Sequence, residues 1–132
     1  MEKNRILVVE DEESLLKLES ILFTSKGYQV TGVRGGNDAL KAIAKDAPDL
    51  VVLDLMLPDM DGFEVCRSIK ENPATSAIPV VMLTAKKSSR DLEHGRQVGA
   101  DAYITKPFKS VKVLEVIEGL LGNEGAAKGD AV

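Results

Sequence analysis

The sequence Leu50-Val-Val-Leu53 is a continuous apolar run rich in β-branched residues, and it is followed at once by Asp54. Residues 6–9 and 80–83 form similar runs. Apolar runs without polar alternation suit strands that are covered on both faces, which indicates a parallel sheet. Residues 28–33 alternate apolar with polar side chains, as an edge strand does.

Helical patterns fill the gaps between the predicted strands. A first helix is predicted from one apolar face and from Gly27, because a glycine often follows the last residue of a helix. That face comprises Leu15, Leu18, Ile21 and Leu22. Asn37 is a candidate side-chain cap at the start of a second helix.

Three further helices are predicted at about residues 62–71, 89–98 and 110–121. The helix at 89–98 is very polar, and its expected apolar anchors are Leu92, the main one, and Val98 at its end. A short fifth strand is predicted at 102–104. Strands and helices therefore alternate along the chain. Right-handed crossovers between them give a doubly wound α/β fold with a five-stranded parallel sheet and five helices.

The length and composition suit a single domain. Of the 132 residues, 1–121 are expected to form the domain, and 122–132 a flexible tail or linker of Gly, Ala and charge. No apolar run approaches the roughly 20 residues that a membrane helix needs. The lone cysteine, Cys66, is expected in the core and fits a reducing, cytoplasmic compartment. His94, the single histidine, is expected on the solvated surface. A net charge of −4 argues against nucleic acid as a direct partner.

Polar residues follow the predicted strands at their carboxyl ends, which a doubly wound sheet brings to one rim. These residues are Glu10, Asp11, Asp54, Thr84, Thr105 and Lys106. Clustered carboxylates repel one another unless a cation joins them, and Mg²⁺ suits a site with one or two carboxylates and a phosphate oxygen. A carboxylate can also attack phosphorus to form an aspartyl-phosphate. Asp54, Lys106 and Thr84 could supply a nucleophile, a fixed cation and a hydroxyl donor for that chemistry.

Five short motifs lie at these strand ends. They are Val8-Val-Glu10-Asp11-Glu12, Asp54-Leu-Met-Leu-Pro58, Met60-Asp-Gly62, Leu83-Thr84-Ala85 and Lys106-Pro107-Phe108. Each motif alone is weak, but all of them in this order resemble the signatures of response-regulator receiver domains from two-component signal transduction, over about residues 4–121. The resemblance implies a flavodoxin-like fold with the strand order 2-1-3-4-5. It also implies a histidine kinase or phosphotransfer protein as the phosphoryl donor.

The resemblance further implies a role for each matching residue. Asp54 would be the phosphoacceptor, with Thr84 and Lys106 on the phosphoryl oxygens. The implied cofactor is Mg²⁺, held by Asp11, by Asp54, by Glu10 through a water and by the backbone carbonyl of Met56. Thr84 and Tyr103 would act as the switch pair, and Pro107 would follow a cis peptide bond. Many members of the family carry Asp where Glu10 stands, although the longer side chain can also reach a water.

The function expected on this basis is a phospho-switch with self-phosphotransfer and autodephosphorylation activity, rather than an enzyme with a free product. Phosphorylation would change the surface made by the helix at 89–98, the strand at 102–104 and the helix at 110–121. That surface would meet an output domain, a target protein or a second copy of the chain. One alternative is a phosphorylation-independent docking module. Another is a Mg²⁺-dependent phosphatase of the haloacid-dehalogenase type, in which an acid would be needed where Met56 stands.

Overall fold

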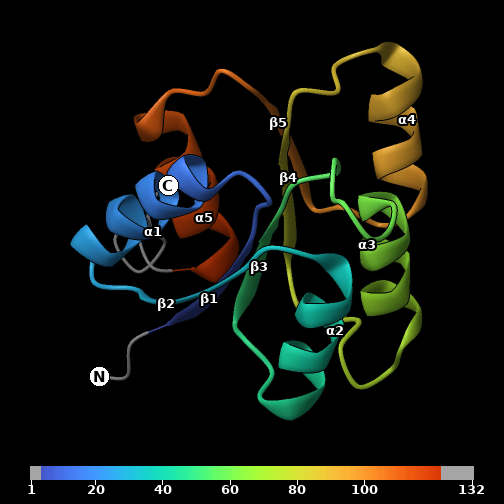
Figure 1. Cartoon of the computed structure of the whole chain (residues 1–132), viewed down its shortest axis with the longest axis horizontal. Coiled ribbons are helices and arrows are strands. Elements are labelled where there is room, and N and C mark those ends of the chain that lie inside the picture. Colours follow the sequence, from blue (N-terminus) through green and yellow to red (C-terminus); the bar gives the residue numbers. More distant parts are fainter. Residues whose placement is uncertain (1–3, 123–132) are drawn as a thin grey trace.

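The computed structural model describes residues 4–122 and shows a five-stranded sheet between two layers of helices (Figure 1). The strands are β1 (Arg5–Val9), β2 (Gln29–Val33), β3 (Leu50–Leu53), β4 (Val80–Thr84) and β5 (Ala102–Thr105). The helices are α1 (Glu13–Ser25), α2 (Gly36–Lys45), α3 (Gly62–Glu71), α4 (Ser89–Gln97) and α5 (Ser110–Leu121). All strand pairs are parallel, in the order β2-β1-β3-β4-β5, which confirms the predicted fold.

The sheet is covered on both faces, as its apolar runs predicted. Helices α1 and α5 lie on one side of it, and α2, α3 and α4 on the other (Figure 1). Successive side chains of a strand point to opposite faces, so Leu53 joins the core under α2 and α3 while Val52 joins the core under α1 and α5. Every residue of β3 and β4 is buried. Cys66 lies in the first of these cores, as predicted.

Residues 123–132, on which most of the predicted tail falls, lie outside the described part of the chain. Gly122, the first residue of that tail, ends α5 with a left-handed φ of 74°. Within residues 4–122, no helix is both long enough and apolar enough to cross a membrane.

The buried face of α1 differs from the prediction. Leu18 and Ile21 are 53% and 61% exposed, whereas Glu19 and Phe23 are fully buried. The helix carries apolar residues on two sides, so hydrophobicity alone does not select the inner one. The inner face of α1 contains the carboxyl group of Glu19, and the spacing of apolar residues alone does not predict a buried charged residue.

The amino terminus of α2 is capped from a distant loop and not by Asn37, so that prediction is wrong. Asp59 accepts hydrogen bonds from the backbone N–H groups of Gly36 at 2.8 Å and Asn37 at 2.9 Å. These bonds lower the pKa of the Asp59 carboxyl. The cap lies 23 residues along the chain, beyond the reach of a local pattern.

Of the two anchors predicted for helix α4, Val98 is confirmed and Leu92 is not. Leu92 is 43% exposed and is not the main anchor, whereas Gly95 and Val98 are buried. A Cβ atom at Gly95 would lie 2.8 Å from the Tyr103 ring, so the glycine permits close packing of α4 on β5. His94 is half-buried and stacks on Phe63 with ring centroids 3.9 Å apart, so its predicted solvated position is also wrong.

Candidate functional site

Carboxylates from two strand ends meet one ammonium at the rim of the sheet. Lys106 Nζ donates hydrogen bonds to Glu10 Oε1 at 2.8 Å and to Asp54 Oδ2 at 3.4 Å. These residues follow β5, β1 and β3, so the topology alone brings them together. They border a cavity of about 250 Å³ lined by Glu10, Asp11, Glu12, Leu15, Asp54, Met56, Ala85 and Lys106.

The loop after β3 fixes the Asp54 side chain. Asp54 is 6% exposed, its N–H donates to the carbonyl of Val9 at 3.0 Å, and its Oδ1 accepts from the N–H of Met56 at 3.2 Å. After this loop the chain comes back beside Leu55 at Gly62, whose N–H donates to the carbonyl of Leu55 at 3.1 Å. A Cβ atom at Gly62 would lie 2.8 Å from the Asp54 carbonyl oxygen, so this return needs glycine.

The pKa values of Glu10 and Lys106 at the rim depend on each other and on the charge of Asp54. Burial raises the pKa of the Glu10 carboxyl; the hydrogen bond from Lys106 opposes that effect and the charge of Asp54 adds to it. Burial by itself lowers the pKa of Lys106, but the hydrogen bond to Glu10 and the charges of Asp54 and Glu10 outweigh burial and raise it. Lys106 therefore stays an ammonium at neutral pH, between two carboxyl groups that face each other.

The two predicted switch residues form hydrogen bonds to the backbone of the same residue, Lys86. Thr84 is fully buried at the end of β4, and its Oγ1 accepts from the N–H of Lys86 at 3.3 Å. The Tyr103 hydroxyl donates to the carbonyl of the same Lys86 at 2.7 Å. Burial, with a smaller effect from the charge of Asp91, raises the pKa of Tyr103 to about 12. Thr84 is not among the residues that line the cavity, and in this structure its hydroxyl oxygen accepts a hydrogen bond from the backbone instead.

Two charged residues near the rim were missed by the sequence analysis. Arg34, just after β2, donates a hydrogen bond from Nε to the carbonyl of Asp11 at 2.9 Å, and its Nη2 lies 4.0 Å from Asp11 Oδ1. Glu19 of α1 is 1% exposed, and its charge acts on Lys106. The signal for Arg34 was its place after a strand end. The signal for Glu19 was a single charge among the apolar residues of α1.

The oxygen donors at the rim fit a hard divalent cation. Among residues 4–122, no three His, Cys, Asp or Glu side chains are grouped so that they could hold a metal on their own. Mg²⁺ does not require such a group, because it keeps several waters and binds through one or two carboxylates together with phosphate oxygens. Asp11, Asp54 and the Met56 carbonyl are donors of that kind. The Lys106–Pro107 peptide bond is cis, as the resemblance implied.

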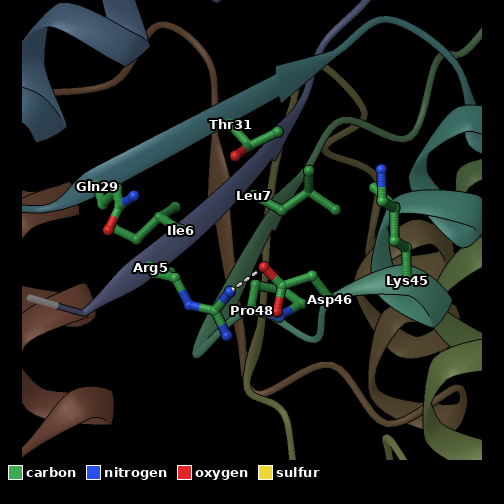
Figure 2. Close-up of a pocket in the computed structure, with 9 residues that line it drawn as sticks. Arg5, Ile6, Leu7, Gln29, Thr31, Lys45, Asp46 and Pro48 are labelled. Carbon is green, nitrogen blue, oxygen red and sulfur yellow. Dashed lines mark ion pairs between the residues drawn. The ribbon is translucent and has the colours of Figure 1, made fainter.

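A second cavity, of about 360 Å³, lies at the opposite end of the strands (Figure 2). Two of its charged groups, Arg5 and Asp46, pair with each other, and the guanidinium of Arg5 also donates to the carbonyl of Ala47. None of the residues predicted to carry chemistry lines this cavity. The candidate functional site is therefore the rim and not the cavity of Figure 2.

Comparisons with known proteins show to which family the chain is similar. The model of the response regulator receiver domain family matches residues 6–118. The DNA-binding response regulator MtrA of Mycobacterium tuberculosis is 46% identical over 107 residues, which are 81% of this chain and 46% of that protein. The response regulator PleD of Caulobacter vibrioides is 40% identical over 116 residues, 88% of this chain and 26% of that protein. The chain thus spans about half the length of these relatives or less.

Solved structures are similar over nearly the whole chain. A response regulator receiver domain protein of Methanospirillum hungatei superposes with a TM-score of 0.87 at 27% identity, covering 96% of this chain and 99% of the other. The receiver domain of a sensor histidine kinase from Pseudomonas aeruginosa, which has magnesium coordinated in its active-site cleft, gives a TM-score of 0.85 at 29% identity, covering 92% and 100%. The chain belongs to the response regulator receiver domain family of two-component signalling.

Proposed function

We propose that this receiver domain accepts a phosphoryl group on Asp54 in a Mg²⁺-dependent reaction. Receiver domains of response regulators interact with histidine kinases, and we propose such a kinase, or a phosphotransfer protein, as the donor. The observation that carries the proposal is the position of Asp54 Oδ2, at the cavity and 3.4 Å from the Lys106 ammonium. A fixed cation beside a nucleophilic carboxylate stabilises the negatively charged group that the carboxylate receives.

The neighbouring residues would bind the metal ion and stabilise the phosphoryl group in the proposed reaction. Asp11, Asp54 and the Met56 carbonyl would hold Mg²⁺, with Glu10 acting through a water. When bound, Mg²⁺ supplies positive charge against the phosphoryl oxygens. Lys106 would move its ammonium from Asp54 to a phosphoryl oxygen. Hydrolysis of the aspartyl-phosphate by the same site would then end the signal.

The proposed output surface is that of α4, β5 and α5. Lys86 links Thr84 to Tyr103 through its backbone N–H and carbonyl, so a Thr84 hydroxyl that turns toward a phosphoryl oxygen would give up its bond to the Lys86 N–H. That change would free Tyr103, which packs against Gly95 of α4. The surface would meet an output domain, a target protein or a second copy of the chain. We propose no direct contact of this domain with nucleic acid, because the chain carries a net charge of −4.

Incubation with acetyl phosphate and Mg²⁺, followed by measurement of the intact mass, tests the proposal. The wild-type protein should gain the mass of one phosphoryl group, and neither Asp54→Asn nor a sample with a chelator should gain it. Steady release of phosphate without an adduct would indicate a phosphatase instead. An unchanged mass and no phosphate release would indicate a docking module.

A further inference from the structure

A second cation lies at the rim, beside Asp11. Lys106 pairs with Glu10 and Asp54, whereas Asp11 Oδ1 faces Nη2 of Arg34 at 4.0 Å. Arg34 directly follows β2, the strand at one edge of the sheet, and has no role in the proposed reaction. Every carboxylate of the proposed metal site therefore has a positive side chain as a neighbour, but Asp11 has a different one from Glu10 and Asp54.

The backbone holds the guanidinium of Arg34 in this position. Arg34 Nε donates a hydrogen bond of 2.9 Å to the carbonyl oxygen of Asp11, the same residue whose carboxylate faces Nη2. The end of β2 is itself fixed at the rim, because the N–H of Glu10 donates to the carbonyl of Val33 at 3.0 Å. Exposed ion pairs are usually weak, in part because two long side chains lose freedom when they pair. Here the bond to the carbonyl already restricts the guanidinium.

The residues that follow Arg34 are anchored as well. Asp59, from the loop between β3 and α3, accepts hydrogen bonds from the N–H groups of Gly36 at 2.8 Å and Asn37 at 2.9 Å. A Cβ atom at Gly35 would lie only 3.1 Å from the carboxylate oxygens of Asp59, so the two loops are in close contact. Arg34 therefore projects from a segment that is bonded to both of the neighbouring loops of the rim.

A positive charge at this place acts in opposite directions on the empty and the metal-bound site. It attracts the Asp11 carboxylate and offsets the repulsion of that carboxylate by Glu10 and Asp54. It also repels a divalent cation that binds to the same carboxylate. The Arg34 side chain is 55% exposed, so solvent and salt weaken both effects. The charge still acts at short range and on a doubly charged ion.

We propose that Arg34 is a resident counter-ion of Asp11, which competes with Mg²⁺ for this carboxylate and lowers the affinity of the rim for the metal. The inference rests on the proposed function. Asp11 exchanges a guanidinium for Mg²⁺ when the metal binds, just as Asp54 gives up the Lys106 ammonium in the proposed reaction. Arg34 thus sets the metal affinity through its charge and is not a ligand of the metal.

Two substitutions at Arg34 separate its charge from its hydrogen bond. Arg34→Gln removes the charge and keeps an N–H donor, whereas Arg34→Lys keeps the charge. Dissociation constants are measured by titration of the full chain with Mg²⁺, followed by amide chemical shifts. In about 0.1 M salt the constant for Arg34→Gln should be roughly threefold lower than that of the wild type, and the constant for Arg34→Lys close to it. In about 1 M salt, where charges act over about 3 Å, the three constants should converge.

The stability of the protein in a chelator is the second measurement. Arg34→Gln should lower the free energy of unfolding in 0.1 M salt, because Asp11 loses its counter-ion, although the same variant binds Mg²⁺ more tightly. Arg96→Gln is the control for a lost positive charge. Arg96 is 79% exposed on α4, which packs on β5 at the opposite edge of the sheet from β2, so the dissociation constant for Mg²⁺ should not change.

The alternative is that Arg34 supports the loop that carries Asp11. Its loss would then raise the dissociation constant of Arg34→Gln, and that result would overturn the proposal. An unchanged constant, a decrease that persists in 1 M salt, or an equal decrease in Arg96→Gln would overturn it as well. Failure of the wild-type protein to bind Mg²⁺ at all would refute the proposed function, and this inference with it.

Discussion

Lys106 Nζ donates a hydrogen bond of 2.8 Å to Glu10 Oε1, although the two residues lie 96 positions apart in the sequence. The same ammonium is 3.4 Å from Asp54 Oδ2. The side chain of Lys106 is 16% exposed, and those of Glu10 and Asp54 are 2% and 8% exposed. One cation therefore separates two carboxyl groups that little solvent screens, and the rim is held together by a side chain that the proposed reaction has to move.

Lys106→Met should destabilise the metal-free protein, because it leaves Glu10 and Asp54 facing each other without a cation. The loss should be roughly 2 kcal/mol, below the 3–5 kcal/mol typical of a fully buried pair, because Lys106 keeps some contact with solvent. Millimolar Mg²⁺ should recover part of the loss by binding only the native state. Urea unfolding with and without Mg²⁺ measures both effects, and Lys109→Met, at an exposed position, is the control. An equal loss in both conditions would contradict the proposed cation exchange.

Asp54→Asn should abolish phosphorylation and leave the fold intact. Asp54 lies at the end of β3 and not inside the core, and the amide can still accept from the N–H of Met56. The substitution removes both an attraction to Lys106 and a repulsion from Glu10, so the free energy of unfolding should change by about 1 kcal/mol or less. Intact mass after acetyl phosphate treatment and a urea titration check the two parts. Asp38→Asn, on the exposed side of α2, should still be phosphorylated.

The metal-free protein should lose stability as the pH rises between about 4.5 and 8. Burial and the charge of Glu10 raise the pKa of Glu19 from 4.5 to about 8, so in this window the folded protein keeps a proton that the unfolded chain has released. Stability is then fully present below the lower value and is lost as the pH passes the higher one. Glu10, whose pKa is also raised, acts in the same direction. Unfolding free energies measured with a chelator at several pH values should give a flatter profile for Glu19→Gln.

Glu13→Gln, on an exposed side chain of the same helix, is the control for that profile and should leave its slope unchanged. Identical slopes for the wild-type protein and Glu19→Gln would show that Glu19 does not hold the proton.

The sequence predicted the strands and the rim well because both depend on simple signals. Apolar runs such as Leu50-Val-Val-Leu53 are buried on both faces when they form inner strands of a covered parallel sheet. Parallel strands also bring the residues that follow their carboxyl ends to the same edge of the sheet. The inner face of α1 was wrong because Glu19 occupies a buried position that hydrophobicity assigns to Leu18. Asp59 was missed because its bonds to α2 depend on how a distant loop folds. Such contacts exist only after the chain is assembled.

Asp59→Ala should lower the stability of the protein, as the removal of a helix cap usually does. Both carboxylate oxygens of Asp59 accept N–H groups at the start of α2, so the alanine leaves two donors without this partner. Asn37→Ala is the matched control, since Asn37 supplies only its backbone N–H to the cap. Urea unfolding of the two variants measures the difference. A larger loss of unfolding free energy for Asn37→Ala than for Asp59→Ala would instead support Asn37 as the cap of α2.

Gly95→Ala should perturb the contact between α4 and Tyr103. Alanine favours a helix interior over glycine by about 1 kcal/mol, which alone would stabilise α4. However, its Cβ would lie 2.8 Å from Tyr103 Cδ2 and 3.2 Å from Met82 Sδ. Ring and helix would have to separate, and the bond of 2.7 Å from the Tyr103 hydroxyl to the Lys86 carbonyl would be strained or lost. We expect no net gain in stability and faster amide exchange along α4.

A double-mutant cycle isolates the cause. In a Tyr103→Ala background the ring that obstructs the new methyl group is gone, so Gly95→Ala should now stabilise the protein by up to about 1 kcal/mol. The difference between the two backgrounds measures the coupling between α4 and β5, because residues in contact do not act additively. Unfolding free energies of the four proteins provide it. Additive effects would mean that Tyr103 does not hold α4, and the proposed route from Thr84 to the output surface would then have to bypass this contact.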